Sequence, residues 1–479
     1  MIRLLQLLSQ QPSHPRTGGS IHLTYRSYTP VTRIVLLGLV LLSLGACSGS
    51  GAGATAFIGA SVFDGSGTPP ILDAVIIVRD GVIEAIGSEA DVRVPRGAQE
   101  FRLDGSWVIP GLIDSHAHPS SWTLTRFLAY GVTSVRGMGG DQESIVALRD
   151  SVSIGSLLGP RLFISGAMID GSPATWSNAT SVSSQSEARQ AVDTRVLIEA
   201  AQVKIYTKIN RELLEAIGDE ASALQIPIAA HLGKVDAITA ARMGVHSLEH
   251  MTGVVEATML DPTRLLRAHS NFFAGWKAAG RAWANLDSAG LDATATTLVE
   301  AGTVIVPTLV QYETYGHLAD DEYISTLDLE GVPQAVRDDW NIPDLIRRAQ
   351  LTQSDYRMFR RSRPAQDLFI RLYRSHNGTV VAGTDAPAQL LAPGASLHDE
   401  LALLVAAGLS PREAILSATR HAAELIEADT VGVLAPGNVA DFVVLAGNPL
   451  EDIHNTRTVE RVVFKGASYH PDELRLDWR

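Results

Sequence analysis

The sequence contains a single cysteine, Cys47, so no disulfide can form within one chain. It is also short of positive charge, because 39 lysine and arginine residues face 52 aspartate and glutamate residues. Nucleic-acid binding needs a basic surface, so this balance argues against a nucleic-acid partner. The content of hydrophobic residues, 46%, is that of an ordinary globular protein. A chain of 479 residues is long enough for one large barrel and a smaller domain.

An apolar run lies close to the N-terminus. Two arginines precede the apolar residues 34–42, and small residues then lead to Cys47. This order is typical of an export signal, and the run is shorter than the about 20 residues that span a bilayer. The letters LGAC resemble the lipobox of bacterial lipoproteins, in which the cysteine is lipidated; a buried anchor helix with an incidental cysteine is the alternative. We expect a signal peptide over residues 1–46 and a lipid anchor at Cys47. Because Ser48 follows, we expect the protein on the periplasmic side of the outer membrane.

Strand-like segments occur near both ends of the remaining chain. After a glycine-rich tether over 47–55, three of them follow, and Asp80-Gly81 between the last two is a strong hairpin signal. Two further segments lie after the last predicted helix. We expect all of them to form one small β-sandwich domain in two parts, 56–107 and 431–479. The predicted strands are 56–63, 74–79, 82–87, 441–445 and 459–465.

Between these parts, residues 108–430 alternate between short apolar strands and helical patterns such as 210–224 and 234–243. Eight strand-then-helix units in order predict an α/β fold, a (β/α)8 TIM barrel. Two connections, 252–302 and 310–377, are long and rich in aromatic residues, and they are either lids over the barrel mouth or packing insertions. The predicted barrel strands are 108–114, 132–136, 162–166, 203–206, 226–231, 245–250, 303–308 and 379–385.

The first barrel strand ends in the letters VIPGLIDSHAHP, residues 108–119. Because side chains alternate along a strand, Asp114, His116 and His118 share one face. Two neutral imidazoles on one face can converge on a metal ion. Two structural histidines are the alternative.

This stretch resembles the first-strand signature of the amidohydrolase superfamily, whose members are metal-dependent hydrolases on a (β/α)8 barrel. The endings of later strands fit the same resemblance: IPIAAH closes with His231, VHSLEH with His250, and VVAGTDAP contains Asp385. The resemblance implies that His116, His118 and Asp385 hold one metal ion, and that His231 and His250 hold a second. Zinc suits imidazole and carboxylate ligands, although manganese or iron stays open.

Lys204, in the letters QVKIY on the fourth strand, indicates a binuclear site. A lysine inside a barrel is costly as a cation and shifts toward its neutral form, which can take up CO2. The resemblance implies that Lys204 is carboxylated and that its carbamate bridges both ions. Alternatively, Lys204 reaches solvent or pairs with an acid. The rival Lys208 lies past the strand and off the motif.

Other residues at the strand ends are candidates for catalysis. We expect Asp385 to accept a proton from the nucleophile and to pass it to the leaving nitrogen. Tyr206 either donates a hydrogen bond to the developing oxyanion or is a core tyrosine. Arg136 either holds a substrate carboxylate or forms a structural ion pair. Asp114, and less clearly His398, are expected to support the ligands.

The letters VKIY, SLEH and GTDAP resemble the prolidase-like and imidazolonepropionase-like branch of the superfamily. We therefore expect hydrolysis of carbon–nitrogen bonds in dipeptides. The alternatives are a hydrolase of cyclic amides or imides, one of lactones or esters, and an inactive binding lipoprotein. The chain departs from the branch at Gly137 and His421. The expected partner is a small-molecule or dipeptide substrate, and a homo-oligomer stays open.

Overall fold

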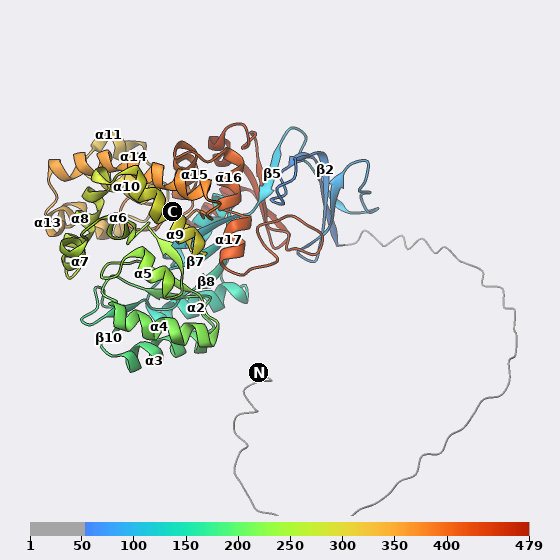
Figure 1. The fold of residues 1–479 in the computed structure, drawn as a ribbon. Helices are drawn as coiled ribbons and strands as arrows, with labels where there is room; N and C mark the ends of the chain where they lie inside the picture. Colours follow the sequence, from blue (N-terminus) through green and yellow to red (C-terminus); the bar gives the residue numbers. More distant parts are fainter. Residues whose placement is uncertain (1–52, 479) are drawn as a thin grey trace, which may run out of the picture. The chain divides into compact units, whose positions relative to one another are not determined.

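The computed structural model describes residues 53–478 of the protein. They form a mixed β-sheet and a (β/α)8 barrel (Figure 1). The predicted signal peptide and the lipidation site Cys47 lie outside the described residues. Within residues 53–478, no helix combines the length and the apolar character needed to cross a membrane.

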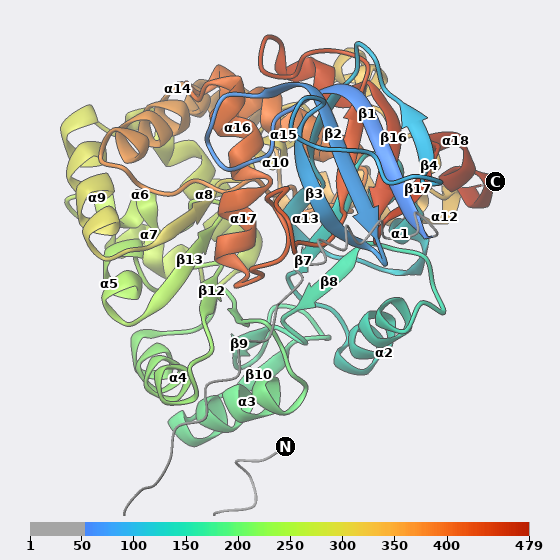
Figure 2. The same ribbon diagram turned by 90° about the vertical axis from the view of Figure 1, so that its right-hand side faces the viewer.

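The mixed sheet contains strands from both ends of the described chain. Its order is β17-β16-β15-β5-β1-β2-β3, with β4 beside β1 (Figure 2). Phe57, Ile76, Phe442 and Val463 are buried together on one of its faces. The turn between β2 and β3 follows the hairpin signal, because Asp80 and its neighbouring glycine both adopt positive φ. The strands are β1 (Ala54–Val62), β2 (Ile71–Arg79), β3 (Val82–Ser88), β4 (Gln99–Arg102), β5 (Trp107–Pro110), β15 (Phe442–Leu445), β16 (Val459–Phe464) and β17 (Ala467–Tyr469).

The predicted strand over 108–114 is in fact two strands. Its first part is β5, which pairs with β15 in the mixed sheet, whereas β6 (Leu112–Ala117) begins the barrel. The chain changes sheet at Gly111. A Cβ atom at this position would lie 2.1 Å from the Thr133 Oγ1, so only glycine fits between the two sheets. The residues on both sides of Gly111 are apolar, so the sequence pattern does not indicate that one strand ends and another begins there.

Short, almost fully buried strands form the wall of the barrel, as expected of parallel strands covered by helices. Neighbouring strands pair in parallel from β6 to β8 and from β11 to β14. The eighth position, residues 379–386, is joined by single bridges from Val380 to Ile305 and from Ala386 to Ala117, which link β14 back to β6. The remaining strands are β7 (Val132–Gly137), β8 (Arg161–Ile164), β11 (Val203–Ile205), β12 (Ile228–Ala230), β13 (Val245–Glu249), β14 (Val304–Val306), and the additional β9 (Ile169–Gly171) and β10 (Thr180–Val182).

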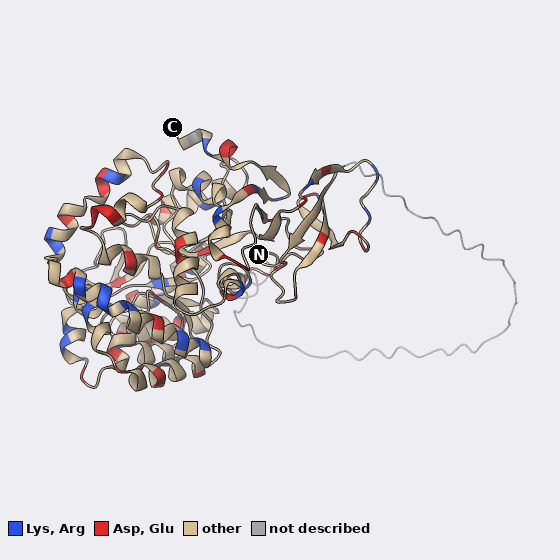
Figure 3. Ribbon diagram, turned by 90° about the horizontal axis from the view of Figure 1, so that it is seen from above, with Lys and Arg blue, Asp and Glu red and all other residues tan. Residues whose placement is uncertain are grey.

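Helices surround the barrel strands, and both long connections are helical. Their surfaces carry interspersed acidic and basic residues (Figure 3). The helices are α1 (Leu124–Ala129), α2 (Gln142–Ser153), α3 (Gln185–Leu197), α4 (Arg211–Leu224), α5 (Ala237–Arg242), α6 (Val254–Thr258), α7 (Thr263–Ala268), α8 (Phe272–Ala282), α9 (Ser288–Glu300), α10 (Leu309–Gly316), α11 (Asp321–Thr326), α12 (Gln334–Trp340), α13 (Ile342–Ala349), α14 (Gln353–Ser375), α15 (Ala395–Ala406), α16 (Pro411–Ser417), α17 (Arg420–Leu425) and α18 (Pro471–Leu474).

Candidate metal centre

The C-terminal ends of the barrel strands meet at a cavity of about 390 Å³. The structure brings every metal ligand implied by the resemblance into the lining of this one cavity. They are His116, His118, Lys204, His231, His250 and Asp385. Residues far apart in the sequence thus converge where barrel enzymes place their chemistry.

One group of ligands consists of His116, His118 and Asp385. Their donor atoms lie within 4.8 Å of one another. The Asp385 Oδ1 is 3.2 Å from the Nε2 of His116 and 3.0 Å from that of His118. Burial favours the neutral carboxyl, but the hydrogen bonds with both histidines hold the pKa of Asp385 well below its usual range. An ionised carboxylate beside two imidazoles is a donor set that suits a divalent ion.

Beside this group lie Lys204 and His250, which are buried, and His231, which is half-buried. The His250 ring centroid is 4.4 Å from that of His116 and 4.8 Å from that of His231. Burial holds the pKa of both His231 and His250 well below the usual value, so both are neutral imidazoles. Neutral imidazole is the form that binds metals.

Lys204 is the most unusual member of this second group. Burial lowers the pKa of its amine to about 8. None of residues 53–478 accepts a hydrogen bond from its Nζ. Buried polar groups are almost always paired, so an unpartnered amine among ligand side chains indicates that something else is bound there. The rival Lys208 donates instead to the Pro173 carbonyl at 2.6 Å, outside the cavity lining.

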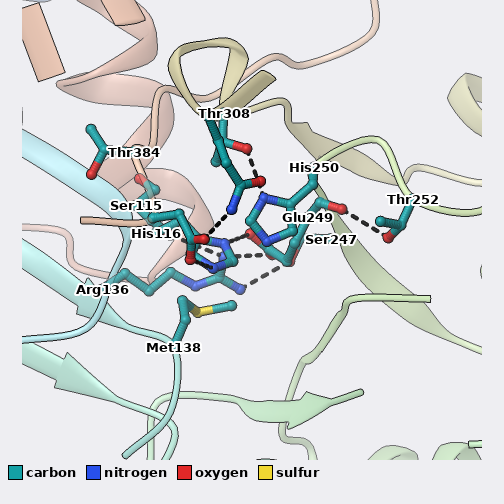
Figure 4. A network of polar contacts seen from close by, with 12 residues as sticks. Ser115, His116, Arg136, Met138, Ser247, Glu249, His250, Thr252, Thr308 and Thr384 are labelled. Atoms are coloured by element: carbon teal, nitrogen blue, oxygen red, sulfur yellow. Dashed lines mark hydrogen bonds and ion pairs between the residues drawn. The ribbon is translucent and has the colours of Figure 1, made fainter. Parts of the chain in front are cut away.

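The Nδ1 atoms of His116 and His250 contact side-chain oxygens of neighbouring residues (Figure 4). The His116 Nδ1 is 2.6 Å from the Glu249 Oε2, and the His250 Nδ1 is 2.7 Å from the Thr308 Oγ1. Such contacts fix the ring orientation and leave the Nε2 available to a metal ion. The donor set, the orientation of the rings and the unpartnered amine therefore fit a pair of divalent ions.

Glu249 is a residue that sequence reasoning missed. It is completely buried, and although burial favours its neutral form, Arg136 and His116 hold its pKa well below the usual range. Strict alternation along β13 would point Glu249 away from His250. However, His250 follows the strand with a φ of 57°, and this left-handed turn breaks the alternation, so both side chains face inward. The sequence carries no signal for that turn.

The structure corrects the expectation that Arg136 holds a substrate carboxylate. Arg136 is buried and does not line the cavity. Its Nη1 is 3.1 Å from the Glu249 Oε1, and its Nη2 donates to the Ser247 Oγ at 2.9 Å (Figure 4). Arg136 therefore forms the ion pair that was its alternative. The guanidinium compensates the charge of Glu249, which in turn holds His116.

Asp114 lies behind the metal ligands. It accepts hydrogen bonds from the Thr384 hydroxyl at 2.7 Å and from the His116 backbone at 3.2 Å. These bonds connect β6 to the chain that leads into Asp385. His398, in contrast, lies elsewhere, because its ring nitrogens contact Thr456 and the Tyr130 carbonyl.

Helix α10 follows β14 and contacts both groups of ligands. Its Gln311 amide donates to the Asp385 Oδ2, and the Tyr312 hydroxyl donates to the His250 carbonyl. The buried carboxylate of Glu400, on α15, accepts a hydrogen bond of 2.7 Å from the Val310 backbone in the first turn of α10. Sequence reasoning named none of these contacts, because they depend on where α15 packs.

Tyr206 lies at the inner end of the cavity, with its ring centroid 4.6 Å from that of His231. Aromatic residues of the two long connections continue the lining outward. Phe272, Phe273 and Trp276 come from α8, and Tyr315 comes from α10. The long connections therefore form part of the cavity wall.

Comparison with known proteins identifies the family. The model of the "Amidohydrolase family" matches residues 107–468, which are most of the chain. The chain belongs to the amidohydrolase family. The protein is therefore a metal-dependent hydrolase of carbon–nitrogen bonds, and the predicted family and fold class are confirmed.

Individual relatives are more distant. An imidazolonepropionase of Aromatoleum aromaticum (strain DSM 19018 / LMG 30748 / EbN1) is 49% identical over 47 residues, which are 10% of this chain and 11% of that protein. A crystal structure of a Xaa-Pro dipeptidase with bound methionine is similar with a TM-score of 0.64 and 20% identity, covering 87% of this chain and 100% of the dipeptidase. A bottromycin amidohydrolase is similar with a TM-score of 0.68 and 22% identity, covering 88% of each chain. These two structures support the fold.

Proposed function

We propose that the protein is a binuclear amidohydrolase that cleaves dipeptides, in the manner of a prolidase. The observation that carries this proposal is the buried, unpartnered amine of Lys204 in the cavity that both groups of ligands line. A neutral lysine amine adds CO2 and releases one proton, which yields an anionic carbamate with two oxygen donors. A site for one metal ion would have no use for such a bridge.

In this proposal, His116, His118 and Asp385 would hold one divalent ion, His231 and His250 would hold the other, and a carbamate on Lys204 would supply oxygen ligands. Zinc is the expected metal because imidazole and carboxylate oxygen suit it. Bound there, the ions would supply a water molecule of lowered pKa and would polarise the amide carbonyl.

The protein's own side chains carry the protons. Asp385 accepts a proton from the attacking water and returns it to the leaving nitrogen, so that the carbon–nitrogen bond breaks to give a carboxylic acid and an amine. Gln311 fixes the orientation of that carboxylate through its Oδ2. Tyr206, beside His231, donates a hydrogen bond to the carbonyl oxygen as negative charge develops on it.

The test is a substrate screen with the metal-loaded protein. The panel contains dipeptides, cyclic amides and imides, lactones and simple esters. We expect turnover of dipeptides, abolished by chelation and restored by zinc. Exclusive turnover of lactones or esters would contradict the proposal, and so would the absence of any turnover by protein that holds two ions per chain.

A second candidate is the hydrolysis of cyclic amides. The short match to an imidazolonepropionase favours it, although that match covers only 11% of the relative. In the same screen, turnover of cyclic amides without turnover of dipeptides would select this candidate.

A further inference from the structure

The outer part of the cavity is walled by aromatic side chains that the proposed mechanism does not use. The rings form a continuous series that begins at the ligand His231. The Phe272 ring centroid is 6.2 Å from that of His231, and the Phe273 ring centroid is 5.3 Å from that of Phe272. Trp176 contacts the same series, with its centroid 5.5 Å from that of Phe272. The series therefore leads from the reacting end of the cavity to its mouth.

A second pair of rings belongs to the same lining. The Trp276 and Tyr315 rings meet edge to face, with centroids 4.8 Å apart. Phe272, Phe273, Trp276 and Tyr315 are all only partly buried. Trp176 keeps 36% of its surface exposed. Large apolar side chains that stay partly exposed within a cavity are positioned to be covered by a ligand.

The charge at the mouth restricts that ligand further. Arg348, on α13, is the one arginine among the described residues of the lining. Its guanidinium carbon lies 5.3 Å from the Phe273 ring centroid, and its Nε is 2.7 Å from the Asp344 Oδ2. A cationic group of a substrate would meet this guanidinium at the outer end of the aromatic series. The lining offers it no carboxylate beyond Asp385, which faces the ligand histidines.

We propose that the substrate is an amide with a large aromatic group beside the scissile bond. This aromatic group packs on Phe272, and it carries no positive charge. This inference rests on the proposed function and names its substrate class. An aromatic ring prefers offset or edge-to-face contact with other rings, and the series offers such faces. When the substrate binds, its aromatic side chain would move from water into contact with the cavity wall. This burial of apolar surface is the source of the selectivity for aromatic substrates.

The experiment compares matched dipeptides with the metal-loaded protein. Phe-Ala and Ala-Phe carry the ring on either side of the bond, Lys-Ala and Ala-Lys carry a cation, and Ala-Ala is the reference. We expect kcat/KM for the better phenylalanine peptide to exceed that for Ala-Ala by about 10- to 100-fold, as expected for burial of a ring. We expect the lysine peptides to be poorer than Ala-Ala. A preference for Ala-Ala or for lysine would overturn this inference and leave the proposed function intact.

Variants of the lining residues test whether these side chains determine the substrate preference. In Phe272→Ala, the ratio of kcat/KM between the phenylalanine peptide and Ala-Ala should fall about tenfold, because part of the ring contact is lost. In Arg348→Gln, the ratio between the lysine peptide and Ala-Ala should rise. Phe101→Ala is the matched control, since Phe101 stacks on Phe57 in the mixed sheet, and it should keep both ratios. An unchanged phenylalanine ratio in Phe272→Ala would contradict the assignment.

A binding measurement separates the two levels of the proposal. Calorimetry with N-acetyl-L-phenylalaninamide and N-acetylglycinamide on the metal-free protein requires no turnover. We expect the phenylalanine compound to bind at least about tenfold more tightly, and Phe272→Ala to remove this difference. If no amide is cleaved but this difference in affinity is found, the proposed function is refuted, whereas the inference that the aromatic side chains bind an aromatic group is supported. Equal binding of both compounds would refute the inference that the aromatic lining prefers an aromatic group.

Discussion

The inner end of the cavity is lined by histidines, a lysine and an aspartate that lie on barrel strands or shortly after them, whereas its outer wall consists mainly of aromatic side chains on inserted helices. Of the inner residues, His116, Lys204 and His250 are buried, and Glu249 holds the ring of His116. The outer rings are half-buried and contact mainly one another. In our proposals, the reaction type depends on the strand ends and the choice of substrate depends on the insertions.

The largest effect is expected at the inner end, from Asp385→Asn. The amide keeps a similar shape but cannot accept the proton, so kcat should fall by about 10²- to 10⁴-fold while bound metal is retained. Steady-state kinetics and metal analysis check this. Asp441→Asn is the control, because Asp441 is also a largely buried aspartate but pairs with Arg161 away from the cavity. Near-normal turnover of Asp385→Asn would remove the role given to this carboxylate.

Lys204→Ala tests whether the two groups of ligands share a bridge. We expect the variant to lose at least one metal ion and its activity, with partial rescue by added short carboxylates that replace the carbamate oxygens. Lys208→Ala should keep both ions, because its amine contacts the Pro173 carbonyl instead. Two tightly bound ions in Lys204→Ala would contradict the carbamate.

Glu249→Gln tests whether the contact of Glu249 with His116 strengthens metal binding. Loss of the charge that holds His116 should weaken metal binding by about 10- to 100-fold, the usual effect of such outer partners. The chain offers a matched control in Glu256→Gln, since Glu256 also contacts a buried histidine, His269, at 2.7 Å. Competition with a fluorescent chelator measures the affinity. If both variants bind metal equally well, Glu249 has no special part in holding the site.

The smallest effect on catalysis is expected from Cys47→Ser. Since lipidation needs the thiol, the variant should no longer partition into membranes, while kcat/KM stays the same. Detergent phase separation after expression in a bacterial host measures this, with Ser48→Ala as the control. A Cys47→Ser protein that still partitions like the wild type would refute the lipid anchor.

Much of the inner end could be predicted from the sequence because each ligand lies on a short apolar strand or shortly after one. Parallel strands of a barrel end at one mouth, so a histidine after one strand and an aspartate after another must converge. His231 and Asp385 were located by this argument and by the family resemblance, and the structure places both in the cavity lining.

What was missed depends on the backbone or on packing between distant segments. The change of sheet at Gly111 and the left-handed turn at His250 leave no trace in the pattern of apolar letters. The position of Arg136 beside Glu249 depends on how β7 and β13 face each other across the barrel. Which rings of the long connections face the cavity depends on how α8 and α10 pack, which no period in the sequence determines.

The central claim is that the strand ends hold two ions around Lys204. Elemental analysis of the purified wild-type protein, after dialysis against metal-free buffer, tests it most directly. We predict two divalent ions per chain, with zinc the main element. Full amidohydrolase activity with one ion per chain or none would contradict the account.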